Sequence, residues 1–555
     1  MHGSLKRTGV VRAIVTATVC AGMLIPVSVS ARGSHAHPAI KRGGTVTVSQ
    51  GPSGSWTANF NPWAASMTNG TGMIWEPLLW FNNLKAGKIT PWLAKSYKWS
   101  NKGKILTFNL RPGVKWNDGK PFTSKDILFS FQAAKKYADF GYCGCTKAVS
   151  KVTAPNATTV QFHLKRPDSS MLFWIGSAEP FPQHYFKGKG DPAKVQLKNP
   201  VATGPFMVGN FSPQVFVLKR NKYYWQKGKP YVDALRYPAY SSNDSNQLAL
   251  VNGEIEYGGV FIPDAQKVYA SKSKYNHFWY SGTGAPVALW LNDAQAPFNN
   301  VHVRRAINFA IDRTLISKVA EYGYEPPGNG AIMLPGYVKK WADPAAAKSA
   351  PAHANVTKAK AELAKAKGVN VSSPLKLNVV SGWSDWVTTV QQISDQLKAI
   401  GMNVQVEPLQ FGAYLQNLQQ GKFDMAISWT AGEGNSPYFL YHDDFSTNPG
   451  TYAPIGQTAT ANFARFKNGT LDKLLSDYTK TTSLKKQVSI IKQASKIVAS
   501  QVPIVNIMNS GNWYEYNDKQ FVGWPTAKNP YDWPMPWAYG HGNGNLNVIL
   551  HIHKK

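Results

Sequence analysis

The stretch Pro91–Gln132 reads PWLAKSYKWSNKGKILTFNLRPGVKWNDGKPFTSKDILFSFQ and carries the strongest structural signal in the chain. Leu106, Phe108 and Leu110 alternate with polar residues, which is typical of a strand that buries one face. We therefore expect antiparallel strands over Leu84–Arg111.

A turn and a helix are predicted next in the same stretch. Asn117–Gly119 is a turn tripeptide, and Thr123 or Ser124 can cap a helix with Asp126 in its first turn. Asp118 and Asp126 invite comparison with the acid–base pair of an enzyme, but turn and cap roles explain both. The stretch holds no nucleophile–base pair, phosphate loop or metal cluster.

Three segments, in this order, resemble the signatures of one protein family. Pro91–Gln132 is similar to a signature of the family 5 extracellular solute-binding proteins. Asn199–Pro230 resembles a second signature, with Ala202 replacing a Gly and Phe206 replacing a Tyr. Leu291–Arg313 resembles the third, which ends in an Ala-Ile-Asp-Arg helix.

The resemblance extends from Gly43 to Val505 and implies an α/β fold that is periplasmic binding protein-like (class II type, three-domain cluster C architecture), with a ligand cleft between lobes. The implied organisation is a signal peptide (1–31), a disordered linker (32–42), domain I (first part, 43–60), domain II (61–195), domain I (second part, 196–288), domain III (289–503) and domain I (C-terminal part, 504–555).

Strand and helix patterns alternate between residues 375 and 429. Strands are expected at Leu375–Val379, Asn403–Val406 and Met425–Trp429, and helices at Val387–Ile400 and Phe411–Gln420. Such alternation predicts a parallel sheet with helices packed on it.

Ligands of open parallel sheets bind beyond the carboxyl ends of the strands. That rule selects residues 381–386 and 430–438, which mix Gly with aromatic and polar side chains, as ligand pockets do. The alternative is that the Trp side chains fill a domain interface. The predicted ligand-binding residues of this region are Trp383, Trp386, Trp429, Glu433, Asn435 and Tyr438.

The resemblance also implies a role for the second of these segments. Peptide-binding members of the family carry an Asp there that pairs with the α-amino group of the ligand. The segment Gly432–Pro437 has no Asp, and Glu433 is the nearest replacement. Both a peptide with a free amine and a neutral ligand of the cello-oligosaccharide type, stacked on Trp rings, therefore remain open.

Other regions could also contribute to the cleft. Trp56 and Asn59, in an early loop, complete the predicted ligand-binding residues, and the aromatic run Trp513–Trp537 is a further candidate. The tail carries His541, His551 and His553. They could form a metal site only if their side chains converged in the fold. Solvated histidines are the simpler interpretation, and we expect no metal and no cofactor.

Composition favours an exported globular protein. The chain has 555 residues and a formal net charge of +31, with 43% hydrophobic and 12% aromatic residues. Nucleic acid is the first partner that such a charge suggests. The Lys residues are nevertheless scattered and form no nucleic-acid-binding motif, so we expect no nucleic acid and favour an anionic wall or membrane surface nearby.

The N-terminus resembles an export signal. Lys6, Arg7 and Arg12 precede the uncharged run Ala13–Val29, and small residues around Ala31 suit cleavage. A retained membrane anchor and lipidation of Cys20 are the alternatives. The expected location is secreted, either periplasmic or at the outer face of the cell membrane, with anchoring left open.

The other two cysteines, Cys143 and Cys145, are separated by one residue. Such a pair can form a tight disulfide or remain reduced, and it lacks the second pair of ligands that a structural zinc site needs. We interpret it as a local link within a loop.

Taken together, these features predict the substrate-binding protein of an ABC importer, not an enzyme. By resemblance it captures peptides by hinge closure, acts as a monomer and delivers the ligand to an ABC permease in the membrane. An oligosaccharide ligand is the alternative within the family. A secreted hydrolase or a basic wall-binding protein is the alternative from another class, but no catalytic motif supports the hydrolase.

Overall fold

The computed structural model describes residues 40–555 except 52–53, 65–69, 138–141, 241–242, 283, 382, 433, 449–450 and 537–544, so the predicted signal peptide lies outside the described residues. Lys41–Lys555 form one compact unit. The predicted disordered linker ends too late, because Lys41 pairs with Lys554 in a β-bridge and the Arg42 guanidinium donates to the Gly228 carbonyl at 2.6 Å. Among the described helices, none is long and apolar enough to cross a membrane.

The stretch that begins at Pro91 builds a four-stranded antiparallel sheet and a helix. The sheet has the order β4-β5-β7-β6, and β5 buries Leu106, Phe108 and Leu110 as predicted. Helix α1 begins after Thr123, whose backbone N–H donates to Asp126 Oδ2 at 2.8 Å. The bounds are β4 Ala94–Ser100, β5 Ile105–Leu110, α1 Ser124–Lys136, β6 Val149–Asn156, β7 Thr159–Leu164, α2 Met171–Gly176 and α3 Gln183–Phe186. A separate hairpin pairs β2 (Leu79–Asn82) with β3 (Lys88–Pro91).

A second sheet joins the start of the chain to the second signature. Its order is β1-β10-β9-β8, and β1 runs parallel to β10, with Val46 opposite Leu235. The strands are β1 Thr45–Thr47, β8 Phe206–Phe211, β9 Val215–Arg220 and β10 Ala234–Pro238.

A third sheet has the order β11-β18-β12, so its middle strand comes from the C-terminal part of the chain. The strands are β11 Tyr257–Gly258, β12 Asn276–Phe278 and β18 Glu515–Asn517. The other elements of these two chain regions are α4 Asn243–Val251, α5 Ala265–Val268, β19 Phe521–Val522, α16 Asn545–Ile549 and β20 His553–Lys554.

The largest sheet has five strands in the order β15-β14-β16-β13-β17. The strands are β13 Pro286–Leu291, β14 Pro374–Val380, β15 Asn403–Leu409, β16 Met425–Trp429 and β17 Ile504–Asn509. β14, β15 and β16 are parallel as expected, but β13 is antiparallel to both β16 and β17. The predicted parallel sheet is therefore confirmed for the three strands it covered, and two antiparallel strands from outside that segment complete the sheet.

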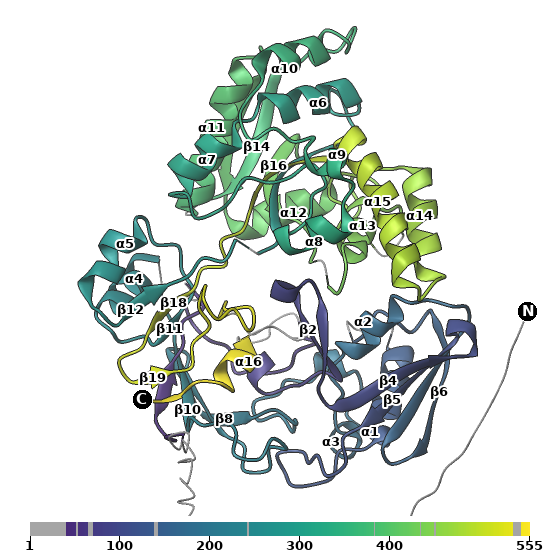
Figure 1. Cartoon of the computed structure of the whole chain (residues 1–555), viewed down its shortest axis with the longest axis vertical. Coiled ribbons are helices and arrows are strands. Elements are labelled where there is room, and N and C mark those ends of the chain that lie inside the picture. Colours follow the sequence, from purple (N-terminus) through teal and green to yellow (C-terminus); the bar gives the residue numbers. More distant parts are fainter. Residues whose placement is uncertain are drawn as a thin grey trace, which may run out of the picture. The chain divides into compact units, whose positions relative to one another are not determined.

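Helices cover both faces of this sheet, as Figure 1 shows in green and yellow-green. Successive residues of β13 point to opposite faces: Val287, Leu289 and Leu291 pack with α6, α7, α10 and α11, whereas Ala288 and Trp290 pack with α8, α12, α13, α14 and α15. The bounds are α6 Val301–Ala310, α7 Arg313–Ala320, α8 Pro335–Trp341, α9 Pro344–Ala347, α10 Val356–Leu363, α11 Ser384–Lys398, α12 Phe411–Gln420, α13 Tyr438–Phe445, α14 Gly469–Thr479 and α15 Leu484–Gln501.

Two chain segments connect the third sheet with the five-stranded sheet. One leads from β12 to β13 and the other returns from β17 to β18, and we call the described residues of 279–285 and 510–514 the double crossing. The two segments are hydrogen-bonded to each other: Gly284 N donates to the Ser510 carbonyl at 3.0 Å, and Trp279 N donates to the Tyr514 carbonyl at 3.1 Å. Paired connections of this kind can serve as a hinge.

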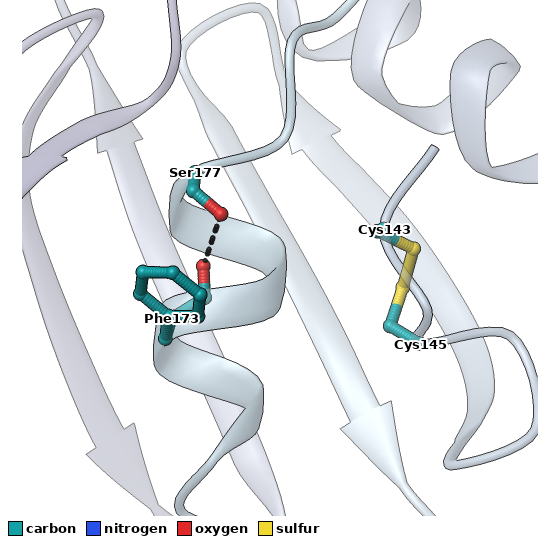
Figure 2. Close-up of a disulfide and its surroundings, with 4 residues drawn as sticks. All are labelled: Cys143, Cys145, Phe173 and Ser177. Atoms are coloured by element: carbon teal, nitrogen blue, oxygen red, sulfur yellow. Dashed lines mark hydrogen bonds between the residues drawn. A yellow bond between two sulfur atoms is a disulfide. The ribbon is translucent and has the colours of Figure 1, made fainter. Parts of the chain in front are cut away.

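Cys143 and Cys145 form a disulfide with a Cα–Cα distance of 5.1 Å, which confirms the expected link within a loop. Figure 2 shows this bond near α2, where Ser177 Oγ donates to the Phe173 carbonyl at 2.8 Å.

Candidate functional site

Three tryptophans gather at the carboxyl ends of β14 and β16. Trp383 and Trp386 lie where β14 passes into α11, and Trp429 is the last residue of β16. The ring centroids are 5.0 Å apart for Trp383 and Trp386, 5.1 Å for Trp383 and Trp429, and 4.6 Å for Trp386 and Trp429. We call these residues the Trp cluster. Its members lie together at the sheet edge that the sequence selected.

The members of the Trp cluster differ in what they can offer to a ligand. Trp386 is buried among the residues of α11, whereas 42% of the surface of Trp429 is exposed. Trp383 is partly buried and contacts both of the other rings. Trp386 therefore packs in the core beneath α11, and Trp429 presents an aromatic surface to solvent.

The loop that follows β16 is held in place by its neighbours. The Tyr337 hydroxyl donates to the Gly434 carbonyl at 2.9 Å, and Ala431 N donates to Asp444 Oδ2 at 2.9 Å. Asn435 is partly buried, and its backbone lies against Gly87, where a Cβ would come within 2.4 Å of the Asn435 Cα. Glu433 lies outside the described residues.

The remaining predicted site residues lie elsewhere. Tyr438 is buried and its ring stacks on Tyr478 at 4.4 Å. Trp56 packs on Phe216 at 5.3 Å in the second sheet, and Asn59 lines a cavity of about 530 Å³ with residues 57, 64 and 193–196. Ligand contact by these three residues stays a prediction. Among the described residues, no group of three or more His, Cys, Asp or Glu could hold a metal ion.

A group of three acids, two of them fully buried and one partly buried, lies beside the double crossing. Glu321 follows α7, Glu325 comes four residues later, and Asp385 is in the first turn of α11. Glu321 and Glu325 are 0% and 2% exposed, and each has one side-chain oxygen without a hydrogen-bond partner among the described residues. We call the three residues the carboxyl cluster.

The carboxyl cluster has unusual electrostatics. Burial raises the pKa of Glu325 to about 8 and that of Asp385 to about 6. Burial, together with the charges of the other two acids, raises the pKa of Glu321 well above its ordinary value. Asp385 lies in the selected segment 381–386, but no sequence signal marked Glu321 or Glu325, because the cluster forms only when α7 packs against α11.

A second buried acid, Glu76, links two of the family-like segments. Its Oε1 accepts hydrogen bonds from Trp92 Nε1 at 2.8 Å and from the Tyr224 hydroxyl at 2.9 Å, and Trp225 Nε1 lies at 3.2 Å. Burial raises the pKa of Glu76 to about 7. These hydrogen bonds connect Trp92 of the first signature segment with Tyr224 and Trp225 of the second, so these motif residues have structural roles.

Segment 169–174 forms an extended contact with the helices of the five-stranded sheet. Ser169 N donates to the Thr479 carbonyl at 2.7 Å, and Gln487 Nε2 donates to Ser169 Oγ at 2.9 Å. The rings of Phe173 and Phe439 lie 4.4 Å apart. Together with the contact between Gly87 and Asn435, these interactions join residues of the predicted domain II to residues of the predicted domain III.

A family model described as bacterial extracellular solute-binding proteins, family 5 Middle, matches residues 88–451. The chain belongs to this family. The periplasmic oligopeptide-binding protein OppA of Salmonella typhimurium is 26% identical over 484 residues, which cover 80% of this chain and 83% of OppA. Di/tripeptide-binding protein 1 of Pseudomonas aeruginosa is 27% identical over 491 residues, which cover 82% and 87% of the two chains.

Solved structures share the fold. A periplasmic oligopeptide-binding protein of an oligopeptide ABC transporter from Thermotoga maritima has a TM-score of 0.84 at 23% identity, covering 92% of this chain and 99% of its own. Its mannohexaose-bound form has a TM-score of 0.81 at 23% identity, with coverage of 92% and 98%. The binding protein DppA of Helicobacter pylori, in complex with the peptide STSA, reaches 0.74 at 22% identity, with coverage of 93% and 98%. The predicted periplasmic binding protein-like fold is confirmed.

Proposed function

We propose that the protein is the substrate-binding component of an ABC importer, and that it captures peptides between its lobes and delivers them to a membrane permease. The observation that carries this proposal is the Trp cluster, which presents the exposed Trp429 at the carboxyl edge of a sheet in a solute-binding fold. The peptide class is supported by relatives named as oligopeptide- and di/tripeptide-binding proteins.

The ligand would lie between the Trp cluster and the loop that follows β16. In this proposal Glu433 pairs with the α-amino group of the peptide, Asn435 adds an amide contact, and Trp429 packs on the ligand. Closure about the double crossing then removes the ligand from water. The protein acts as an exported monomer, binds without turnover, and is either free or anchored at the outer face of the membrane.

An oligosaccharide is the second candidate ligand, and the Trp cluster favours it. Exposed indole rings stack well on the apolar faces of sugar rings. One structural relative was solved with bound mannohexaose. No Asp occupies the segment Gly432–Pro437, so the chain lacks the family's usual partner for a peptide amine.

Mass spectrometry of the ligand released from purified protein separates the two candidates. A mixture of short peptides would support the peptide proposal, and a hexose ladder would replace it with the sugar proposal. Recovery of cleaved products after incubation with an intact ligand would instead indicate a hydrolase.

A Glu433→Gln substitution tests the proposed amine contact more narrowly. If Glu433 pairs with a ligand amine, affinity for a peptide with a free N-terminus should fall about tenfold or more, since a charge-assisted hydrogen bond contributes about 1.5–3 kcal/mol. An N-acetylated peptide should bind the wild type and the variant equally. Equal affinity of both proteins for the free peptide would remove Glu433 from this role.

A further inference from the structure

The carboxyl cluster contacts the double crossing directly. Glu325 Oε1 accepts a hydrogen bond from Gly511 N at 2.7 Å, and Gly511 belongs to the returning segment of the crossing. The residues after Glu325 follow the same path: Asn509 N donates to the Pro326 carbonyl at 3.0 Å, and Gly328 N donates to the Ile507 carbonyl at 2.9 Å. Any movement of the crossing must therefore move or break contacts of Glu325.

The carboxyl cluster lies where α7 and α11 pack together beside the double crossing. Glu321 ends the turn after α7, Asp385 begins α11, and Thr389 of α11 lies 3.2 Å from Glu321 Oε1. The second oxygens of Glu321 and Glu325 are buried and have no hydrogen-bond partner in the described part of the chain. An ionised carboxylate in such a place is costly, because burial removes the water that would otherwise stabilise its charge.

The charged groups described around the cluster do little to stabilise a negative charge on its members. The charges that act on Glu321 and Glu325 are those of acids in the cluster itself. On α7, the nearest basic residue in sequence, Lys318, is exposed to solvent. On the crossing side, Tyr280 and Glu515 are engaged with each other at 2.6 Å. The cluster is therefore compatible with burial when its members are protonated, and unfavourable when they are ionised.

We propose that Glu321, Glu325 and Asp385 act as positioning residues that couple lobe closure to proton uptake at the double crossing. Protonated, the three groups pack without net charge and hold the crossing through the bond from Gly511 to Glu325. Ionised, they repel one another in a region of low dielectric constant, and opening of the crossing relieves the repulsion by admitting water. Ligand would thus be held at low pH and released more readily as pH rises. This inference deepens the proposed function and rests on it, since it assigns a control of closure to the same cleft.

Burial raises the pKa of Asp385 to about 6 and that of Glu325 to about 8, so the cluster as a whole loses protons in this pH range. The closed form should therefore lose population between pH 6 and pH 8.

The distance between two spin labels, measured by pulsed EPR, tests the proposal without any ligand. Cysteines introduced at Lys98 on β4 and Lys360 on α10 place labels at exposed positions, while Cys143 and Cys145 remain paired in their disulfide. We expect the wild-type background to show a lengthened or broadened distance distribution at pH 8.5 relative to pH 5, with a midpoint between 6 and 8. An unchanged distribution across this range would overturn the proposal.

The double variant Glu321→Gln, Glu325→Gln provides the decisive comparison, because an amide resembles a protonated carboxyl group but cannot ionise. The spin-label distance distribution of this variant should be the same at every pH from 5 to 8.5 and should match that of the wild-type background at pH 5. The single variant Asp385→Asn, at a partly exposed position that folding tolerates more easily, removes one of the repelling charges and should weaken the pH response. A wild-type pH response in both variants would contradict the proposal.

Glu76→Gln is the matched control, since Glu76 is another buried acid with a raised pKa, and its partners Trp92 and Tyr224 lie outside the crossing. It should retain the wild-type pH response. Because these measurements use ligand-free protein, their failure would leave the peptide proposal intact, and failure of the peptide proposal would leave them unaffected.

Discussion

The residues that make this family recognisable in sequence have structural roles here. Trp92 comes from the first signature segment, and Tyr224 and Trp225 come from the second. All three donate hydrogen bonds to the buried Glu76. A buried acid of this kind is tolerated only because several donors surround it. The signatures therefore mark positions where the fold depends on specific polar partners.

Replacing Glu76 with Ala should destabilise the protein without changing its ligand. The substitution leaves Trp92 Nε1 and the Tyr224 hydroxyl buried without this acceptor, and each such loss costs about 1–3 kcal/mol. We expect a loss of about 2–4 kcal/mol in urea unfolding. Glu76→Gln, which keeps an acceptor, should lose less, and equal losses in the two variants would contradict this role for Glu76.

Trp429→Ala should weaken ligand binding while leaving stability nearly unchanged. Because 42% of its surface is exposed, its removal should change the free energy of unfolding by less than about 1 kcal/mol. Ligand affinity, measured by calorimetry with the ligand identified by mass spectrometry, should fall at least about tenfold, or about 1.4 kcal/mol. Trp99→Ala, which removes a partly buried Trp from β4, serves as the control and should bind normally.

Sequence patterns predicted the individual helices and strands better than they predicted which strands pair. The order β14, α11, β15, α12, β16 was predicted from apolar spacing, since each of these elements buries one face or stripe on the same sheet. The antiparallel positions of β13 and β17 were not predicted, because a strand's own sequence does not specify its neighbour. The same limit hid the carboxyl cluster: Glu321 and Asp385 are far apart in the sequence, and only the packing of α7 on α11 brings them together.

The gathering of the Trp cluster was predictable because a general rule applied. Trp383, Trp386 and Trp429 were selected because strand ends of a parallel sheet share an edge, and they do lie together. Trp56 and Asn59 were chosen from loop composition alone, which gives no information about position relative to a sheet edge. In the structure Trp56 packs on Phe216 of the second sheet, and Asn59 accepts a hydrogen bond from Leu197 N in a loop.

The hairpin formed by β2 and β3 should control how closely it approaches the loop that follows β16. Gly87 has φ of +72°, and a Cβ there would lie 2.4 Å from the Asn435 Cα. Gly87→Ala should therefore displace the hairpin from the loop after β16 and lengthen the spin-label distance at pH 5. Gly113→Ala is the matched control, because Gly113 has φ of +76° but no described atom within 4 Å of the place that a Cβ would take. Both variants should lose about 1 kcal/mol of stability from backbone strain, and only Gly87→Ala should change the distance.

For the molecule as a whole, buried acids predict greater stability in mildly acidic solution. Burial raises the pKa of Glu76 to about 7, of Glu325 and Glu515 to about 8, and of Asp385 and Asp532 to about 6. Between the ordinary carboxyl pKa and these values, the folded protein binds more protons than the unfolded chain. The stability contributed by these protons is complete below the ordinary pKa and is lost as pH rises through the raised one.

The melting temperature should therefore fall between pH 5 and pH 8.5. For Glu76, whose pKa rises from 4.5 to about 7, the loss amounts to about 3 kcal/mol. Differential scanning calorimetry of the wild type and of Glu515→Gln checks this, since the variant cannot ionise at that position and should show a shallower decline. A melting temperature that rises over this range would contradict the assignment of protonated buried acids.

The position of β18 has a consequence for how the protein is made. β18 is the middle strand of its sheet, and its Asn517 pairs with Asn276, which precedes it by 241 positions. Synthesis therefore delivers β11 and β12 long before the strand that must separate them, and both remain without their ladder partner during that interval. This part of the molecule can be completed only after nearly the whole chain has emerged, and until then the nascent polypeptide carries two open strand edges that other chains could pair with.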